Sequence, residues 1–390
     1  MEEFIRFVKG RSVSDGFLEW LHLLLLMDDT VLFATSRERL CEKLNLLAEW
    51  CDKSGMVINE DKTEFMAFCS PDVEKRPITL HLKHGNVNVT HCSEYTYLGA
   101  IFTSDGLLKS SLKRHAAHKE KDLNKLTIFL QKNANAPYVV KKAVVDACFN
   151  ASLLYGCEAW LGTKPDRSLK SMYIKAIKML LGVRRSTTND AVLIEAGYPD
   201  FEALVRSRQK RFLEKMGERI DVTNDPLMFT LSLTHRENPV VSRYINGVME
   251  EVDILASDLR VRKEKIELST RTKLMTYRVM NPNLSVHPLY ESKDRVSDDY
   301  LRISFSRFRL SSHRLKIETG RWTGIPQENR LCQCGQSVQT ERHVLCDCAL
   351  VNHIRNSFGY ENVELDEFIS NASKRHLSML KAILEFYTNL

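Results

Sequence analysis

The feature that most constrains this 390-residue chain is a pair of adjacent aspartates between two apolar segments. Residues 17–27 and 30–34 are rich in apolar side chains, and Asp28 and Asp29 separate them without a Gly, Pro or Asn. Both segments are short and the second is rich in strand formers, so the pattern predicts a β-hairpin with the carboxylates at its tip. Paired carboxylates are typical ligands of Mg²⁺ together with substrate phosphates. The alternative interpretation is a solvated Asp-Asp turn.

Residues 35–106 alternate between helical and strand patterns. Ser36 predicts the start of a helix, apolar residues then recur at helical spacing, and Gly55 ends it. Short strands are expected at residues 57–58 and 65–69. A further small sheet, with a turn at residues 84–86, is expected from residues 78–82, 87–89 and 95–103.

Long helical patterns predominate after residue 107, and Pro-containing segments separate several of them. The expected helices cover residues 107–133, 138–161, 166–181, 201–220 and 240–280. The predicted fold class is therefore α+β and mostly α, with a small α+β unit, a large helical unit and a terminal unit rich in Cys and His.

The terminal unit holds four of the ten cysteines within 17 residues, together with His343. This clustering favours a metal site in a reducing compartment over a disulfide scaffold. Cys332, Cys334 and His343 with Cys348 give the spacing C-x-C-x₈-H-x₄-C, and Cys346 is the alternative fourth ligand. Three thiolates and one imidazole predict a closed, structural Zn²⁺ site.

A basic run precedes this cluster at residues 302–321, with six Arg or Lys side chains and one Glu. Phe305 and Phe308 lie within it, and cations mixed with aromatic rings suit contact with nucleic acid. The predicted contact residues are Arg302, Arg307, Arg309, Arg314 and Lys316. A basic helix face packed through the two phenylalanines is the competing interpretation. The net charge of +6 is compatible with a nucleic-acid partner.

The order of these motifs resembles the second half of the palm in reverse transcriptases of non-LTR (LINE-type) retrotransposons. Met27-Asp28-Asp29 looks like the catalytic x-Asp-Asp motif of that family, which implies that Asp28 binds Mg²⁺ and that Asp28 and Asp29 are catalytic. Residues 55–63 are similar to the next motif, which implies that Lys62 lies near the triphosphate of the incoming nucleotide. Tyr97-Leu98-Gly99 looks like the primer-grip hairpin.

The resemblance extends to the later parts of the chain. Residues 152–160 are similar to a stretch of the family's thumb, which contacts a duplex through phosphates, and Lys113 and Arg114 are candidates for that contact. A solvated charged helix face is the alternative for these two residues. The family pattern C-x-C-G…E-x-H-x-x-x-x-C favours Cys348 over Cys346, and such zinc motifs are implicated in binding element RNA or target DNA.

This resemblance implies an organisation in four parts. They are residues 1–106, the C-terminal half of a palm with a primer-grip-like hairpin; 107–235, a helical thumb-like region; 236–320, a helical connector with the basic run; and 321–390, a zinc-binding segment.

The family also implies a third catalytic aspartate and a fingers region upstream of the aspartate pair. Asp15 is the only aspartate among the first 27 residues, and its surroundings are typical of a turn. We therefore expect an N-terminally truncated reverse transcriptase that binds RNA or DNA, uses Mg²⁺ only within a complete palm, and does not polymerise by itself. The alternative is a non-catalytic, zinc-dependent nucleic-acid-binding protein.

Charged residues interrupt the N-terminus, so no secretory signal is expected, and the leucine run at residues 21–27 is too short to span a bilayer. The expected location is intracellular, cytoplasmic or nuclear, without a membrane partner. No small-molecule substrate is expected beyond the deoxynucleoside triphosphates of the full-length relative.

Overall fold

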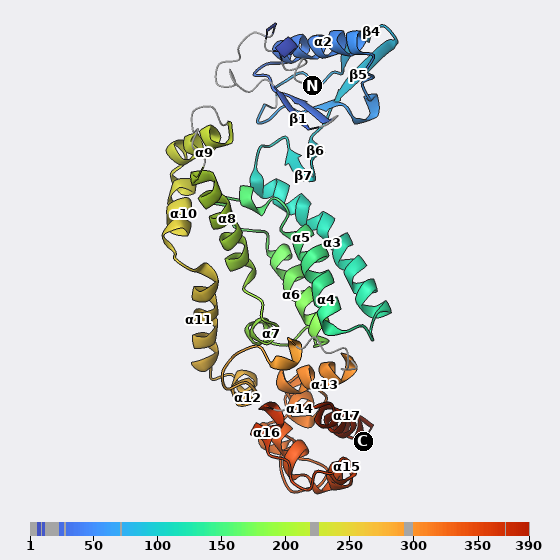
Figure 1. Cartoon of the computed structure of the whole chain (residues 1–390), viewed down its shortest axis with the longest axis vertical. Helices are drawn as coiled ribbons and strands as arrows, with labels where there is room; N and C mark the ends of the chain where they lie inside the picture. Colours follow the sequence, from blue (N-terminus) through green and yellow to red (C-terminus); the bar gives the residue numbers. More distant parts are fainter. Residues whose placement is uncertain are drawn as a thin grey trace. The chain divides into compact units, whose positions relative to one another are not determined.

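The computed structural model describes residues 6–8, 10–11, 23–26, 29–70, 72–218, 226–291, 299–370 and 372–389. Helices predominate and the sheets are small, which confirms the predicted mostly helical α+β class (Figure 1). The chain divides into two compact units. Unit 1 comprises Met1–His115, Trp160–Thr163 and Leu213–Asn246, and unit 2 comprises Ala116–Ala159, Lys164–Phe212 and Gly247–Leu390. The division into four parts stays a prediction.

The predicted N-terminal hairpin is present in unit 1. Strand β1 (Leu23–Leu26) pairs antiparallel with β2 (Asp29–Leu32), and Leu26 lies opposite Asp29. Met27 and Asp28, which connect the strands, lie outside the described residues. The register places Asp29 at the end of the hairpin beside this connection.

Helix α2 (Arg37–Ser54) follows the hairpin and has the predicted ends. The Ser36 hydroxyl accepts a hydrogen bond from the Arg39 N–H at 3.3 Å, and Gly55 ends the helix with a φ of 71°. Leu44 and Ala48 of this helix belong to one core with residues of a three-stranded sheet. This sheet has the order β3 (Glu64–Phe65), β5 (Gly85–His91) and β4 (Ile78–Leu82).

Two strand predictions in this region were wrong. Residues 57–58 form no strand, and of residues 65–69 only Phe65 belongs to one. The chain instead makes a 3₁₀ turn, η2 (Glu60–Lys62), where the Asn59 carbonyl accepts the N–H groups of Lys62 and Thr63. Cys69 adopts a φ of 53° and donates its N–H to the Ser104 carbonyl, which ends any extension of β3.

The later strands form two sheets where one was expected. Strands β6 (Glu94–Tyr97) and β7 (Ala100–Thr103) make a separate hairpin, with Leu98 and Gly99 in its turn. The turn between β4 and β5 is at residues 83–84, one residue earlier than expected.

The predicted helices are present, but those at residues 138–161 and 240–280 are divided, and the first of these ends at residue 153. They are α3 (Leu108–Lys132), α4 (Tyr138–Val144) with the π-helical η3 (Val145–Asn150) and α5 (Ala151–Leu153), α6 (Arg167–Leu181), α8 (Phe201–Gly217), α10 (Pro239–Glu250), α11 (Ile254–Glu267) and α12 (Thr272–Met280). Two more helices, α7 (Asn189–Ala196) and α9 (Pro226–Glu237), were not predicted. No helix among the described residues is both long and apolar enough to cross a membrane.

Residues 280–387 of unit 2 share one hydrophobic core, which includes Phe305, Phe308, Leu345, Phe368 and Ile383. The helical elements around it are α13 (Asp299–Arg309), α14 (Lys316–Trp322), the π-helical η7 (His343–Asp347), α15 (Asn352–Ser357), α16 (Leu365–Ser370) and α17 (Lys374–Asn389). The basic run and the Cys/His cluster are therefore parts of one packed body.

Candidate active site and metal centre

The hairpin of β1 and β2 places Asp29 of the aspartate pair. Asp29 begins β2 and its side chain is exposed, whereas Asp28 lies outside the described residues. The strand pairing fixes the backbone of Asp29 while its carboxylate stays exposed, so the side chain is available to a metal ion.

Tyr95 of β6 links the primer-grip-like hairpin to η2. Its hydroxyl donates a hydrogen bond to the Lys62 carbonyl at 3.1 Å. Burial, followed by the negative charges of Asp29 and Glu64, raises the pKa of Tyr95. The structure therefore joins β6 to the segment that carries the exposed Lys62, and the charge of Asp29 acts on the same tyrosine. Tyr95 and Glu64 were not predicted as site residues, because neither is among the residues that the motifs of the sequence indicate as functional.

The primer-grip-like residues form a tight turn. Leu98 and Gly99 have φ values of 48° and 80°, as in the type I′ turns of two-residue hairpins. Leu98 is an unusual residue for this conformation, and its side chain is 41% exposed at the tip of the hairpin. Strain of this kind is often found at functional sites.

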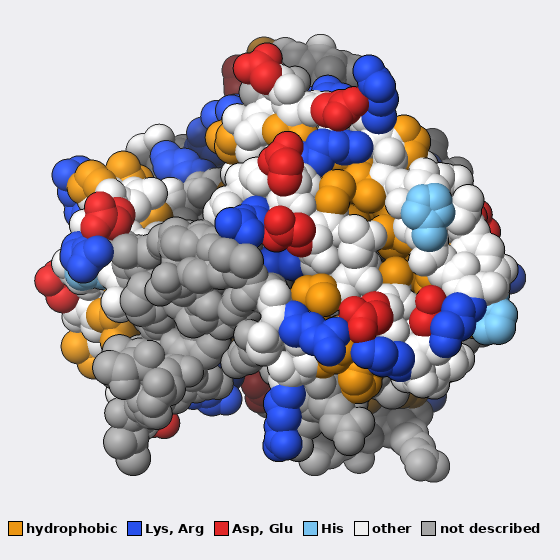
Figure 2. All heavy atoms as spheres, turned by 90° about the horizontal axis from the view of Figure 1, so that it is seen from above, with side chains coloured by type: hydrophobic (Ala, Val, Ile, Leu, Met, Phe, Trp, Pro, Cys, Tyr) orange, Lys and Arg blue, Asp and Glu red, His pale blue; other side chains and the backbone are white. Residues whose placement is uncertain are grey.

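The predicted contact residues on α3 differ in their surroundings. Lys113 is exposed, whereas the Arg114 Nε lies 2.9 Å from a carboxylate oxygen of Glu94 on β6. Figure 2 shows lysine and arginine side chains interspersed with aspartate and glutamate over the coloured part of one face.

In unit 2 the structure brings Cys332, Cys334, His343 and Cys348 together, with all four ligand atoms within 4.8 Å of one another. The Sγ atoms of Cys332 and Cys348 are 3.7 Å apart, and the Cys334 Sγ is 3.3 Å from His343 Nε2. Ligand atoms on a tetrahedron with Zn–S distances of about 2.3 Å are separated by about 3.8 Å. This group therefore fits a zinc ion, and Cys346 is not a member of it.

Local structure explains why these ligands converge. The Cys332 carbonyl accepts the Gly335 N–H, and Gly335 has a φ of 74°, so the C-x-C pair lies on a tight turn. His343 begins the π-helical η7 and Cys348 follows its last residue, and the Cys348 N–H donates to the His343 carbonyl at 2.8 Å.

Tyr387 of α17 is a further part of this centre that sequence reasoning missed. Its hydroxyl donates a hydrogen bond to the Cys348 Sγ at 2.8 Å and lies 3.6 Å from the Cys332 Sγ. Donors to metal-binding thiolates orient them and reduce their charge. Tyr387 lies 39 residues from Cys348 on an amphipathic helix, where it resembles any other core residue.

Two residues of the basic run are not available to phosphates, contrary to the prediction. Arg302 and Arg309 are each 1% exposed. Arg302 donates to Asp299 at 2.7 Å and to the Leu180 carbonyl at 3.0 Å. Its guanidinium also lies over the Tyr138 ring at 4.5 Å.

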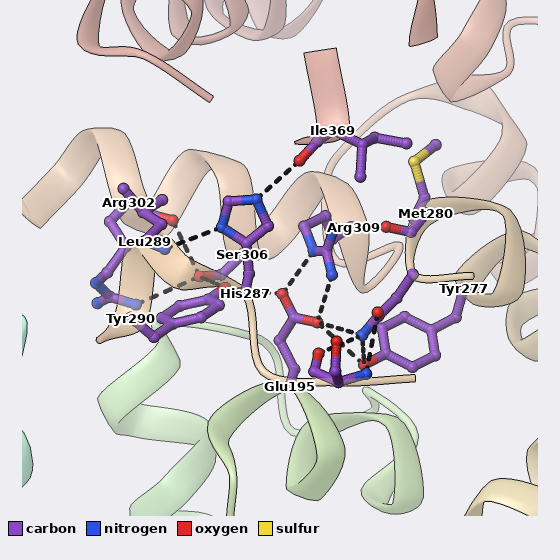
Figure 3. Close-up of polar contacts among 12 residues, drawn as sticks. Glu195, Tyr277, Met280, His287, Leu289, Tyr290, Arg302, Ser306, Arg309 and Ile369 are labelled. Atoms are coloured by element: carbon purple, nitrogen blue, oxygen red, sulfur yellow. Dashed lines mark hydrogen bonds and ion pairs between the residues drawn. The ribbon is translucent and has the colours of Figure 1, made fainter. Parts of the chain in front are cut away.

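Arg309 pairs with Glu195 of α7, which is itself fully buried (Figure 3). The Arg309 Nε and Nη2 atoms donate to the two carboxylate oxygens at 2.6 and 3.1 Å. The hydroxyls of Tyr277 and Tyr290 donate to the same carboxylate at 3.0 Å each. This network joins α7, α12 and α13, so these arginines serve the packing of unit 2, as in the competing interpretation of a packed basic helix face.

Arg307, Arg314 and Lys316 are the exposed cations of the run. Arg307 projects from the opposite side of α13 to Phe305 and Phe308, which are both completely buried. The predicted contact with nucleic acid therefore concerns these three residues of the five.

Comparison with protein families gives one match. Residues 1–102 match the family of the reverse transcriptase (RNA-dependent DNA polymerase). The matched segment contains the aspartate pair, Lys62 and the turn at Leu98-Gly99, and it supports a reverse-transcriptase-like polymerase. No curated protein matches the chain.

Proposed function

We propose that this chain is a non-LTR retroelement reverse transcriptase that binds RNA and DNA, such as element RNA and target DNA. One observation carries the proposal: Asp29 lies at the end of a hairpin within the segment that matches reverse transcriptases. Mg²⁺, which such domains use, would stabilise the attacking and leaving oxygens of phosphoryl transfer.

The residues of unit 1 have separate roles in this proposal. Asp28 and Asp29 would hold Mg²⁺, Lys62 would contact the nucleotide triphosphate, and the Tyr97-Leu98-Gly99 turn would contact the primer. The hydrogen bond from Tyr95 to the Lys62 carbonyl supports a common site, because it fixes the primer-grip-like hairpin to the segment that carries Lys62.

The Cys/His group is proposed to hold a structural zinc ion. The donor set of three thiolates and one imidazole, and the 3.7 Å separation of two of its sulfur atoms, support zinc over harder cations. Such a site would fix the turns around residues 332–348 and the core that contains them.

The test is extension of a DNA primer on an RNA template with Mg²⁺. The purified chain is compared with Asp28→Ala, Asp29→Asn and the control Glu42→Gln, which removes an exposed carboxylate of α2. Extension that disappears in both aspartate variants and persists in the control supports the polymerase and would overturn the expectation that this chain does not polymerise by itself. Extension that persists in Asp29→Asn refutes the assignment of this residue.

A second candidate function is non-catalytic, zinc-dependent binding of nucleic acid. It is favoured by the location of the Cys/His group and the exposed arginines, because all of these lie in unit 2. Salt-sensitive binding that is retained in Asp29→Asn and lost in Cys348→Ser, without primer extension by any variant, distinguishes this function from the polymerase.

A further inference from the structure

A loop that follows α6 is fixed against the turn between α13 and α14. The Arg184 N–H donates to the Ser312 Oγ at 2.8 Å, and these residues are 128 positions apart in the sequence. Arg307 donates from Nε to the Gly182 carbonyl at 2.7 Å. A Cβ at Gly182 would lie 2.8 Å from Ile303, so only glycine permits this approach of the loop to α13.

These contacts gather three guanidinium groups. Arg184 bonds through its N–H to Ser312, two residues before Arg314, and Arg307 bonds to Gly182, two residues before Arg184. Burial and the positive charges of Arg314 and Arg307 also lower the pKa of Arg184. Arg184, Arg307 and Arg314 are therefore close enough to repel one another. None of the three forms an ion pair with a carboxylate in the part of the chain that the structure describes.

Glu318 is the acidic residue whose charge reaches Arg184. Its carboxylate is already used, because it lies 2.8 Å from the Lys273 Nζ and also pairs with Arg321. Glu318 therefore does not neutralise the three arginines. The hydrogen bonds of the loop hold these arginines in place on the surface.

An aromatic ring lies at the edge of this cluster. The Arg184 guanidinium lies 4.4 Å from the centroid of the Trp322 ring, and 56% of Trp322 is exposed. The contact between Arg184 and the ring is a favourable cation–π interaction that holds the two side chains together, while much of the ring stays exposed to solvent.

We propose that Arg184, Arg307, Arg314 and Trp322 form a binding surface for single-stranded nucleic acid. The arginines contact successive phosphates, and an unpaired base stacks on the exposed part of Trp322. A single strand fits better than a duplex because the bases of a duplex are already stacked on one another. The inference rests on the proposed nucleic-acid-binding function and assigns it a location.

The turn that carries Arg314 is also tied to the segment of the Cys/His group. The Ser311 Oγ and the His313 Nε2 each lie 2.9 Å from the same carboxylate oxygen of Glu341. Ser311, His313 and Glu341 are all buried, so the position of the surface depends on the fold of the metal-binding segment.

The experiment measures fluorescence anisotropy of labelled single-stranded RNA and DNA oligonucleotides, with a duplex of the same length, at several salt concentrations. The full chain is compared with Arg184→Gln, Arg307→Gln, Arg314→Gln, Trp322→Ala and Trp322→Phe. Arg260→Gln is the matched control, because Arg260 is an exposed arginine of α11 in the same unit.

Trp322→Ala is expected to weaken single-strand binding by about 5- to 100-fold, and Trp322→Phe to restore most of it. Each arginine variant is expected to reduce the slope of log affinity against log salt by about 0.7. Arg260→Gln should leave both quantities unchanged.

Two results overturn the inference in different ways. If the wild-type chain binds single strands and the variants bind equally well, this surface is refuted and the proposed function stands. If the wild-type chain binds no nucleic acid at any salt concentration, the proposed nucleic-acid-binding function fails together with the inference. Because the altered side chains are exposed or partly exposed, thermal unfolding of each variant serves as the check that it is folded.

Discussion

Removal of the Arg309 side chain by Arg309→Met is expected to lower the free energy of unfolding by about 3–5 kcal/mol. Glu195 is fully buried and accepts two hydrogen bonds from the Arg309 guanidinium. Each such charge-assisted bond contributes about 1.5–3 kcal/mol, and two of them together agree with the cost of breaking a buried ion pair. The tyrosine hydroxyls of residues 277 and 290 remain, but they do not neutralise the carboxylate.

Adding Glu195→Gln to Arg309→Met gives a double variant. In this double variant much of the lost free energy of unfolding is expected to be restored. A neutral amide can still accept hydrogen bonds from Tyr277 and Tyr290, and no unpaired charge is then left in the core. The Met280 carbonyl, which accepts a hydrogen bond from Arg309, stays unsatisfied in both variants, so recovery is incomplete.

Urea unfolding followed by circular dichroism measures these differences, and a chain with two units requires the transition of unit 2 to be followed separately. Arg260→Met is the control, since it removes an exposed arginine of α11 in the same unit and is expected to cost less than about 1 kcal/mol. A loss below about 1 kcal/mol in Arg309→Met, or a double variant no more stable than the single one, would refute the reasoning.

Three further predictions concern other parts of the chain. Chelation of zinc, or Cys348→Ser, is expected to lower the free energy of unfolding of unit 2 by at least about 3 kcal/mol in thermal or urea unfolding, whereas Cys346→Ser has a small effect. Burial and the charge of Arg309 lower the pKa of His287 from its ordinary value of 6.5, so acidification from neutral pH through 6.5 protonates only the unfolded state and decreases stability. His287→Asn should flatten this pH dependence. Leu98→Asn, which gives the preferred Asn-Gly sequence for the turn, should raise stability by about 0.5–1 kcal/mol.

Each of these predictions has a clear contrary outcome. Equal effects of chelator on Cys348→Ser and on the wild-type chain would exclude zinc at this group. The His287 prediction depends on a neutral ring, because Nδ1 accepts the Leu289 N–H at 3.1 Å while Nε2 lies 2.8 Å from the Ile369 carbonyl. An unchanged pH profile in His287→Asn contradicts it, and a less stable Leu98→Asn contradicts the proposed turn strain.

Local sequence signals determined much of unit 1 and of the metal centre. Ser36 and Gly55 set the ends of α2, because a side-chain cap and a left-handed glycine act within one turn of the helix. The apolar segments around the aspartate pair predicted the hairpin, because strand formation depends on residues that are neighbours in the sequence. The spacing of the Cys and His residues likewise indicated a metal site with Cys346 or Cys348 as the fourth ligand, and the family resemblance favoured the Cys348 that the turns at residues 332–348 bring to the other three donors.

Local signals failed where a side chain depends on distant residues. Arg302 and Arg309 look the same as Arg307 and Arg314 in the sequence, since all four belong to one basic run. Only the packing of α7 against α13 decides that Arg309 faces Glu195, a residue 114 positions away.

The sequence by itself thus determined the aspartate hairpin, the mostly helical α+β class and the four metal-binding donors. The tertiary structure alone decided which arginines are buried, that Tyr387 donates to Cys348, and that Arg184 lies over Trp322. The physical reason is that burial and electrostatic pairing arise between segments far apart in the chain, and no periodicity or spacing within one segment carries that information.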